Sequence, residues 1–390
     1  MSSELTRVLS VIHSPFFGGP HNQVLRLDAP LRARGYETVA VVPDEPGNAY
    51  DRLAAGGVDV VRLPLGRLRA RPDWRVQRDS LRTLAGDIPR LSALILERDV
   101  GLVVLHGSVN LQGAVAARRC GRPVVVQILD TRTPNALRWL FAPLLRVLAT
   151  TVMTTGHAVA EAHPWLQRDP SRCFSFFPPV DTTEFRPDDE RRLDVRSELG
   201  VHPDEVLVGC VSNLTPQKGL DLFVDVARRL SCSRPNVRFA LFGRRMETHE
   251  SYADGLLMRA GDLTRGNLLT VRDVGSEISR YVRALDLFLA TAEPRSEGIS
   301  TTILEAMASG VPVVSTDVGA IREAVVTGIT GFLAPPGDVD GLVEAVAGLV
   351  VDDDRREAMA RAGRERAVTD FDVARCADVH ARAFAAALRR

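Results

Sequence analysis

Short apolar runs alternate with amphipathic stretches along the chain. In the first half the runs are rich in Val, Ile and Leu, which is typical of strands buried in a parallel sheet. They cover Val8–His13, Glu37–Val42, Val58–Leu63, Gly101–His106, Pro123–Leu129 and Thr151–Thr155. The stretches between them suit helices, for example Gln23–Gly35, which ends at a glycine. This alternation predicts an α/β architecture with parallel sheets.

The same alternation continues in the second half of the chain. Strands are expected at Val206–Ser212, Val237–Gly243, Leu268–Val274, Leu285–Ala290 and Val311–Thr316. Helices are expected at Leu220–Leu230, Leu342–Leu349 and Phe371–Arg390. The highly charged segment Pro187–Leu199 lies between the halves and suits a linker helix. A length of 390 residues is enough for two or three domains, each with its own core.

Two segments fit this alternation less well. Leu65–Asp79 is rich in Arg, Pro and Trp without a clear period, and we expect a loop or irregular helix there. Leu137–Met153 is the most membrane-like segment, but Arg138, Pro143 and Arg146 interrupt it, so it does not span a membrane. A helix packed on the core is the favoured alternative, and a helix lying on a membrane surface is the other.

The stretch Arg295–Asp317 combines a loop, a short helix and a strand. Its apolar residues recur at helical spacing, Gly310 ends the helix, and the apolar run that follows suits a buried parallel strand. Thr302 followed by Glu305 is a capping-box pattern. Two other residues could cap the helix in its place: Ser300 and Thr301.

The start of this helix has the properties of an anion site. Gly298 lets a ligand approach the backbone closely, and the first amides of a helix have no partner within it. With the helix dipole they favour a phosphate group. Glu297 and Glu305 would be roughly 12 Å apart in a helix, one near each end of an elongated polar ligand. The alternative is an amphipathic core helix with a Glu cap.

Seven residues separate Glu297 from Glu305, and Glu305 is followed by Ala-Met-Ala-Ser-Gly-Val-Pro-Val-Val-Ser-Thr. This pattern resembles the signature of the retaining GT-B glycosyltransferases of glycosyltransferase family 4. The resemblance implies two Rossmann-like domains facing each other across a cleft. It places Glu297 beside the donor sugar and Glu305 on the ribose. The diphosphate would be held by the backbone of Gly298, Ile299 and Ser300.

The resemblance extends to the first strand end of the second half. There Asn213-Leu-Thr-Pro-Gln-Lys-Gly219 precedes a helix, and the family assigns Lys218 to the donor phosphates. The family usually has Arg at the position of Asn213, so this pocket lacks one positive charge. Arg244 or Arg245, at the next strand end, could reach the phosphates in its place. A solvent-exposed pair of arginines is the alternative.

In the first half, Gly18 and Gly19 follow the first strand and resemble the flexible glycine pair with which the family's N-terminal domain closes on donor and acceptor. A plain turn is the alternative. His21 beside them could be a surface histidine or an acceptor contact. His106 lies at the carboxyl end of its strand, where ligands of such sheets gather.

The chain departs from the family where many members end a strand with His. Leu129 occupies that position, and Asp130 and Arg132 after it could bind the acceptor. The resemblance implies an acceptor-side domain at 1–182 and a donor domain at 183–370. A helix at 371–390 would return to the first domain. Phe176–Phe185 resembles the segment that connects the domains, and Ile329–Asp338 the family's post-signature loop.

Composition is that of an ordinary globular protein, with 45% apolar and 25% charged residues. The formal net charge is zero, which gives no argument for nucleic acid or for a strongly anionic membrane surface. Five scattered cysteines and the lack of a signal peptide indicate a cytoplasmic protein with reduced thiols. The acidic runs at residues 338–340 and 352–354 are expected to be solvated and not to bind metal.

The family resemblance implies a retaining glycosyltransferase with a nucleoside diphosphate sugar as co-substrate and no further cofactor. Glu297 and Lys218 would be catalytic, and the departing phosphate would take the acceptor proton after front-face attack. The acceptor could be a small molecule, a lipid or a glycan, with peripheral membrane contact. The alternatives are another sugar-nucleotide enzyme on this fold, a hydrolase or epimerase, and a catalytically silent binding scaffold.

Overall fold

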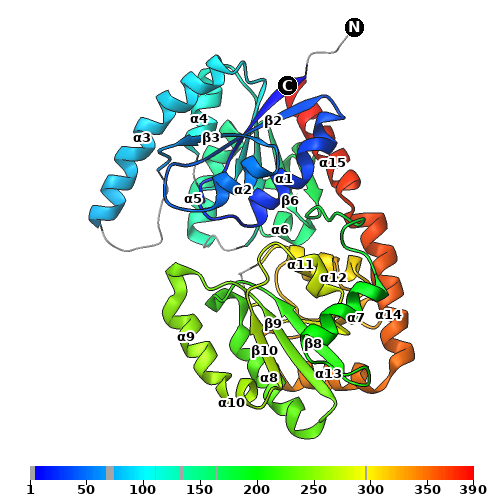
Figure 1. Cartoon of the computed structure of the whole chain (residues 1–390). Helices are drawn as coiled ribbons and strands as arrows, with labels where there is room; N and C mark the ends of the chain where they lie inside the picture. The colour runs from blue at the N-terminus through cyan, green and yellow to red at the C-terminus, as the bar shows by residue number, and fades with distance from the viewer. Residues whose placement is uncertain (1–4, 67–73, 110, 132–134, 164, 295–296) are drawn as a thin grey trace. The chain divides into compact units, whose positions relative to one another are not determined.

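Figure 1 shows the computed structural model of the chain. The structure describes residues 5–66, 74–109, 111–131, 135–163, 165–294 and 297–390. The chain divides into two compact units. The first contains Met1–Leu129, Thr133–Pro179 and Val373–Arg390, and the second Asp130–Arg132 and Val180–Asp372. The domain boundaries predicted from the sequence lie after residues 182 and 370.

The first unit is built on a parallel sheet, with seven strands in its described part. Their order is β3-β2-β1-β4-β5-β6-β7, so the sheet grows outward in both directions from β1 and β4. The strands are β1 Thr6–Val11, β2 Tyr36–Pro43, β3 Asp59–Leu63, β4 Leu102–His106, β5 Val124–Ile128, β6 Thr151–Thr155 and β7 Cys173–Phe176. Leu9, Val103 and Val126 in the central strands are fully buried. The apolar runs of the sequence therefore form the core of this unit.

Helices of the first unit cover this sheet. They are α1 Gly19–Arg32, α2 Ala49–Ala55, α3 Trp74–Glu97, α4 Gln112–Arg119, α5 Asn135–Leu148, α6 His157–Glu161 and α15 Val373–Leu388. The last helix, α15, packs on α1 (Figure 1). Its Ala377 and Phe384 are part of the core of this unit. The end of the chain is therefore part of the first unit.

The prediction of a loop or irregular helix at residues 65–79 was wrong for its described end. Residues 67–73 lie outside the described part, but α3 is already helical at Trp74 and continues to Glu97. Ile88, Leu91 and Ile95 recur at helical spacing, and the last two are fully buried. The apolar face that specifies this helix lies beyond the segment in which no period was found.

The second unit has its own parallel sheet, with six strands in the residues described. Their order is β10-β9-β8-β11-β12-β13. They are β8 Val206–Val211, β9 Val237–Phe242, β10 Leu269–Arg272, β11 Leu287–Ala290, β12 Val313–Thr316 and β13 Gly331–Ala334. The expected loop at 329–338 thus contains a strand. Gly331 allows it, because a Cβ there would lie 2.1 Å from the carbonyl oxygen of Val313 on β12.

The helices of the second unit are α7 Asp189–Glu198, α8 Leu220–Ser233, α9 Glu250–Arg259, α10 Gly261–Arg265, α11 Ile278–Val282, α12 Thr301–Ala308, α13 Val339–Val351 and α14 Asp353–Arg366. The predicted linker helix is α7, and it is anchored within this unit. Arg192 and Arg196 on α7 both bind Asp286, which also accepts a hydrogen bond from the amide of Leu207 at 2.7 Å. Its charged side chains therefore fix α7 to the sheet.

The acidic runs cap helices. Asp338 accepts from the amide of Gly341 at the start of α13, and Asp352 from that of Arg355 at the start of α14, both at 2.9 Å. Within the described ranges, no three His, Cys, Asp or Glu residues are grouped so that they could hold a metal ion. None of the helices described is both long and apolar enough to cross a membrane.

Candidate active site

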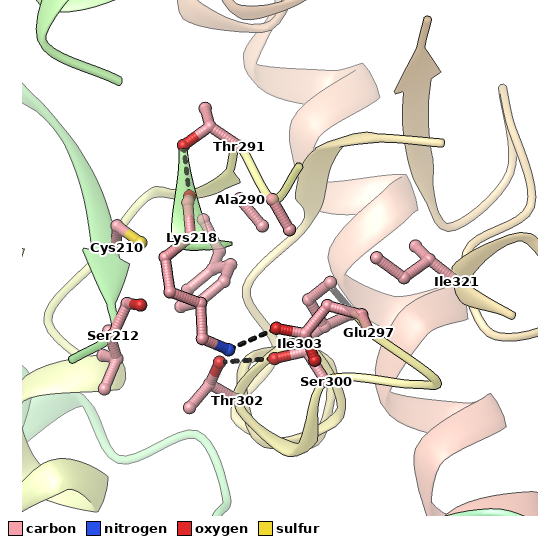
Figure 2. A pocket seen from close by; sticks show the side chains of 13 residues that line it. Cys210, Ser212, Lys218, Ala290, Thr291, Glu297, Ser300, Thr302, Ile303 and Ile321 are labelled. Carbon is pink, nitrogen blue, oxygen red and sulfur yellow. Dashed lines mark hydrogen bonds and ion pairs between the residues drawn. The ribbon is translucent and has the colours of Figure 1, made fainter. Parts of the chain in front are cut away.

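A pocket lies in the second unit where its strand order reverses. Strand β8 has β9 on one side and β11 on the other, and ligands of open α/β sheets bind beyond the carboxyl ends of strands at such a point. The open space in the pocket is about 300 Å³. It is lined by Cys210, Val211, Ser212, Lys218, Phe288, Ala290, Thr291, Ala292, Glu297, Ser300, Thr302, Ile303 and Ile321 (Figure 2).

Lys218 enters this pocket from the turn that precedes α8. Gly219 after it has φ +57, and a Cβ there would lie 2.0 Å from the carbonyl oxygen of Thr291. The hydroxyl of Thr291 donates to the carbonyl oxygen of Lys218 at 3.2 Å. The turn is thus pressed against the end of β11, and only glycine fits this close approach in a left-handed conformation. This packing fixes where the ammonium group lies.

Lys218 is the only lysine in the chain. Every other basic side chain among the 49 lysines and arginines is an arginine. An ammonium group is a compact point charge, whereas a guanidinium is a flat fork of five donors, so the two are not interchangeable at a tight site. The family resemblance identifies Lys218, and its being the only lysine is an independent signal in the composition.

Glu297 is the partner of Lys218 in the pocket. The Nζ atom of Lys218 donates to Oε1 of Glu297, and the two side chains are 30% and 13% exposed (Figure 2). The loop that carries Glu297 is held by the turn after β12. A Cβ on Gly319, which has φ +59, would lie 2.3 Å from the carbonyl oxygen of Glu297. The amide of Ala320 donates a hydrogen bond to the carbonyl oxygen of Gly298 at 2.8 Å. The two predicted catalytic residues therefore meet in one ion pair.

The start of α12 differs from the predicted capping box. The helix begins at Thr301, so Thr302 lies inside it, and Ser300 is the N-cap residue by position. The side chain of Ser300 accepts no amide hydrogen bond, and its hydroxyl is 3.0 Å from that of Thr302. The helix start therefore faces the pocket with no side-chain cap, which leaves its first amides available to an anion.

The estimate of roughly 12 Å between Glu297 and Glu305 assumed a continuous helix. The helix begins at Thr301, so Glu297 lies in the preceding loop. Glu305 is 3% exposed within α12 and is not among the residues that line the pocket. Its assignment to a ribose stays a prediction of the resemblance.

The two candidate arginines at the end of β9 differ in their pairing. Arg245 binds Asp254 at 2.5 Å, whereas no carboxylate of the described chain pairs with the exposed Arg244. The carbonyl oxygen of Arg244 accepts from the amide of Leu214, beside the exposed Asn213. None of these residues lines the pocket in this structure. Of the two arginines, Arg244 is therefore the one that is available to bind a ligand.

In the first unit, Gly18 is the N-cap of α1 and Gly19 its first residue. His21 is fully buried, so the surface alternative was wrong. The amide of Gly18 donates to Nδ1 of His21 at 3.2 Å, and Nε2 donates to the carbonyl oxygen of Ser14 at 3.0 Å. Burial lowers the pKa of His21 to about 4. This neutral ring engages both nitrogens in shaping the loop, which leaves neither for an acceptor.

His106 lies at the end of β4, where the order of the first sheet reverses. Its Nε2 shares a hydrogen bond of 2.7 Å with the hydroxyl of Ser10 on β1, while its buried Nδ1 has no partner among the residues described. Burial and the nearby His21, His380 and His13 lower the pKa of His106 to about 3. The ring is therefore neutral at physiological pH.

Buried polar groups that were not predicted from the sequence lie beside this point. The side-chain amides of Gln23 and Gln127 donate to Nε2 of His380 at 2.9 and 3.1 Å, and Nδ1 of His380 donates to the carbonyl oxygen of Cys376 at 2.8 Å. The signal in the sequence was Gln127 itself, a polar residue within an otherwise apolar strand. This network joins α1, β5 and α15 across the core.

At the second departure from the family, Leu129 packs against the core that includes Met153 and Phe176. A leucine there contributes to packing and offers no polar group. Asp130 follows it and is half-buried. Arg132 lies outside the described residues. Their roles toward an acceptor stay predictions.

Two family models match the chain. Glycosyl transferases group 1 matches residues 205–352, and Glycosyl transferase 4-like domain matches residues 18–174. The chain belongs to the group 1 glycosyltransferases, of the family 4 type. The match with the first model contains the whole pocket, including Lys218 and Glu297. The resemblance inferred from the signature is confirmed.

Relatives of this glycosyltransferase include two mannosyltransferases. It is 35% identical over 209 residues to the lipopolysaccharide core biosynthesis mannosyltransferase LpsB of Rhizobium meliloti (strain 1021), covering 53% of this chain and 58% of that one. Thus the matched part spans a little over half of LpsB. Over 356 residues, 87% of each chain, it is 28% identical to the GDP-mannose-dependent alpha-(1-6)-phosphatidylinositol monomannoside mannosyltransferase of Mycolicibacterium smegmatis.

A solved structure shows the fold. Alr3699/HepE of Anabaena, in complex with UDP and glucose, matches 97% of this chain and 99% of its own with a TM-score of 0.81 and 21% identity. The glycosyltransferase therefore has the GT-B fold, with two Rossmann-like parallel-sheet domains, as the sequence predicted.

Proposed function

We propose that this glycosyltransferase moves a sugar from a nucleoside diphosphate to an acceptor hydroxyl, with retention at the anomeric carbon. One observation carries the proposal. The only lysine of the chain reaches into the pocket at the strand reversal, beside Glu297 and the uncapped start of α12. A cation and unpaired amides together at one point suit a diphosphate.

In this proposal the first amides of α12 and the ammonium of Lys218 hold the donor diphosphate. Negative charge grows on that group as it leaves, so donors already aimed at it stabilise the transition state more than the ground state. The carboxylate of Glu297 would favour the positive character that develops at the anomeric carbon. The family signature adds a ribose contact from Glu305.

The proposed reaction is a front-face substitution. The acceptor oxygen bonds to the anomeric carbon while the bond from that carbon to the diphosphate oxygen breaks. The departing oxygen takes the proton of the acceptor hydroxyl, so no separate base is needed. The products are a glycoside and a nucleoside diphosphate.

We propose GDP-mannose as the donor and a glycan-bearing lipid as the acceptor. The relative that matches 87% of the chain is named as GDP-mannose-dependent, and its named substrate is a phosphatidylinositol mannoside. LpsB is likewise named as a mannosyltransferase of lipopolysaccharide. UDP-glucose is the competing donor to include, because the HepE structure contains UDP and glucose at 21% identity.

Because Lys218 is the only lysine, an amine-selective reagent can report on this one side chain. Limiting acetic anhydride is expected to label Lys218 more slowly when GDP is present, and GMP should protect it less. The terminal amine of the same chain serves as the internal control. Equal labelling of Lys218 with and without every nucleoside diphosphate would refute a donor site here and favour the silent scaffold.

Turnover then separates the remaining alternatives. Release of GDP from GDP-mannose that requires a glycolipid acceptor supports transfer, whereas release in water alone indicates a hydrolase. Lys218→Arg keeps the charge but replaces the compact ammonium, so we expect kcat/KM to fall, as for Lys218→Ala. Arg361→Ala, an exposed cation on α14, is the control and should retain full activity.

A further inference from the structure

Helix α5 of the first unit has apolar residues on both of its faces. Ala142, Leu145 and Leu148 face the core and are buried. The opposite face exposes large apolar side chains, at 69% for Trp139, 70% for Leu140, 43% for Leu144 and 73% for Val147. A surface helix of a globular protein normally places polar residues there.

This exposed stripe is unusual within the molecule. Residues 139, 140, 143, 144 and 147 recur at helical spacing, and all of them are exposed. Elsewhere in the described chain, the exposed large apolar residues occur one to an element: Leu96, Leu193, Met258, Ile329, Val351, Val368 and Leu388. Single exposed residues need no explanation, but a contiguous stripe indicates a binding surface.

Arginines surround the carboxyl end of α5. Arg146 is exposed on the helix itself. Arg118 on α4 donates to the carbonyl oxygens of Leu148, at 2.8 Å, and Val147, at 3.4 Å. Arg172 donates to the carbonyl oxygen of Arg146 at 3.4 Å. These guanidinium groups satisfy the last carbonyls of the helix, which also favour positive charge.

The arginines are close enough to act on one another. The pKa of Arg172 is lowered mainly by burial and further by Arg390, Arg118 and Arg146, while Asp169 opposes the shift. Asp169 also pairs with Arg390, at 3.8 Å. Asp169 thus pairs with two of these guanidinium groups, while neither Arg118 nor Arg146 pairs with a carboxylate among the described residues. The zero net charge of the chain conceals this local excess of positive charge.

We propose that α5 binds the surface of a bilayer that contains anionic phospholipid. The stripe would lie in the plane of the interface, with Trp139 at the boundary between acyl chains and headgroups, and the arginines would contact the phosphates. At about 1.5 Å per residue the 14 residues of α5 reach about 21 Å, which is shorter than a hydrocarbon core of about 30 Å. The helix therefore lies on the membrane and does not cross it.

An anionic bilayer fits this surface better than a second copy of the chain. In a symmetric dimer the same face meets itself, so the four arginines would meet arginines without an excess of carboxylates. An anionic bilayer offers apolar and negative groups together. This inference rests on the exposed residues of the first unit and holds whether or not the proposed reaction is correct.

Vesicle flotation with the full chain tests the proposal. Binding to vesicles of phosphatidylglycerol and phosphatidylcholine should exceed binding to phosphatidylcholine alone by about tenfold and should fall as salt rises. Leu140→Gln with Val147→Gln should reduce binding about tenfold, because about 0.8 kcal/mol is lost for each CH₂ group withdrawn from the apolar phase. Met258→Gln, an apolar residue 83% exposed on α9, is the matched control and should bind as the wild type.

The charge and depth of binding give two further readouts. Arg146→Gln should weaken the salt-sensitive part of binding, while Arg361→Gln should leave it unchanged. Bound vesicles should shift tryptophan emission to shorter wavelength, and Trp139→Phe should abolish the shift but retain most binding. Equal vesicle binding by the wild type and the Leu140→Gln, Val147→Gln variant, with circular dichroism showing both folded, would overturn the proposal. A dimer that this variant dissociates, in a chain that ignores vesicles, would also overturn it.

Discussion

Replacing Gly219 with Ala should reveal how strongly the turn that carries Lys218 depends on close packing. Two costs are expected. An L-residue in the left-handed region, here at φ +57, costs about 1–2 kcal/mol. The new Cβ would also stand 2.0 Å from the carbonyl oxygen of Thr291, and forcing atoms into a packed site costs typically about 1–3 kcal/mol.

Gly275 provides a matched control for the first cost. Its φ is +56, it lies in the same unit, and nothing lies within 4 Å of the position of a Cβ. Gly275→Ala should therefore carry only the conformational cost. The difference in the free energy of unfolding between the two variants, about 1–3 kcal/mol, would measure the close approach of Gly219 to Thr291.

Urea unfolding followed by circular dichroism measures that difference. Tryptophan emission is unsuitable, because Trp74, Trp139 and Trp165 all belong to the first unit. Gly219→Ala should also displace Lys218 and weaken GDP binding in calorimetry, while Gly275→Ala should not. If the two variants unfold at the same urea concentration and bind GDP equally, the turn is not held by this contact and the reasoning fails.

Three further predictions follow from other contacts. Arg244→Ala should weaken GDP binding by about 1.5–3 kcal/mol, and Arg245→Ala should not, because Arg245 is already paired with Asp254; calorimetry on both variants decides. Turnover should survive EDTA, and activity that returns only with manganese or magnesium would contradict this. Burial lowers the pKa of His380 to about 4, so its contribution to stability is complete above pH 6.5 and is lost as the pH falls toward 4. Urea midpoints at pH 7 and pH 4.5 should therefore differ less in His380→Gln than in the control His202→Gln, which alters an exposed ring.

The inner strands of the two sheets were predictable because they are buried on both faces. Such strands read as continuous apolar runs, and β12 lies in the run predicted at residues 311–316. Strand β13 was missed, because its four residues follow a turn and include Gly331. Its place in the sheet depends on pairing with β12, and a single segment carries no signal of its partner.

The candidate site was predictable as residues but not as geometry. Resemblance identified Lys218 and Glu297, which lie 79 positions apart, yet their ion pair depends on how two loops pack. The capping box at Thr302 was a valid local pattern, but the helix begins two residues earlier than it predicts, with Ser300 as its N-cap. For His21, the sequence showed a histidine beside two glycines, and only the folded loop shows the ring buried.

The ion pair between Lys218 and Glu297 has a consequence for the order of events. The proposed diphosphate would compete with this carboxylate for the ammonium group of Lys218, so donor entry would exchange one anion for another. Glu297 would then lose its counter-charge only when the donor has arrived. In the empty pocket, Lys218 would neutralise the carboxylate of Glu297. Binding of the donor would break this ion pair and leave the carboxylate beside the sugar.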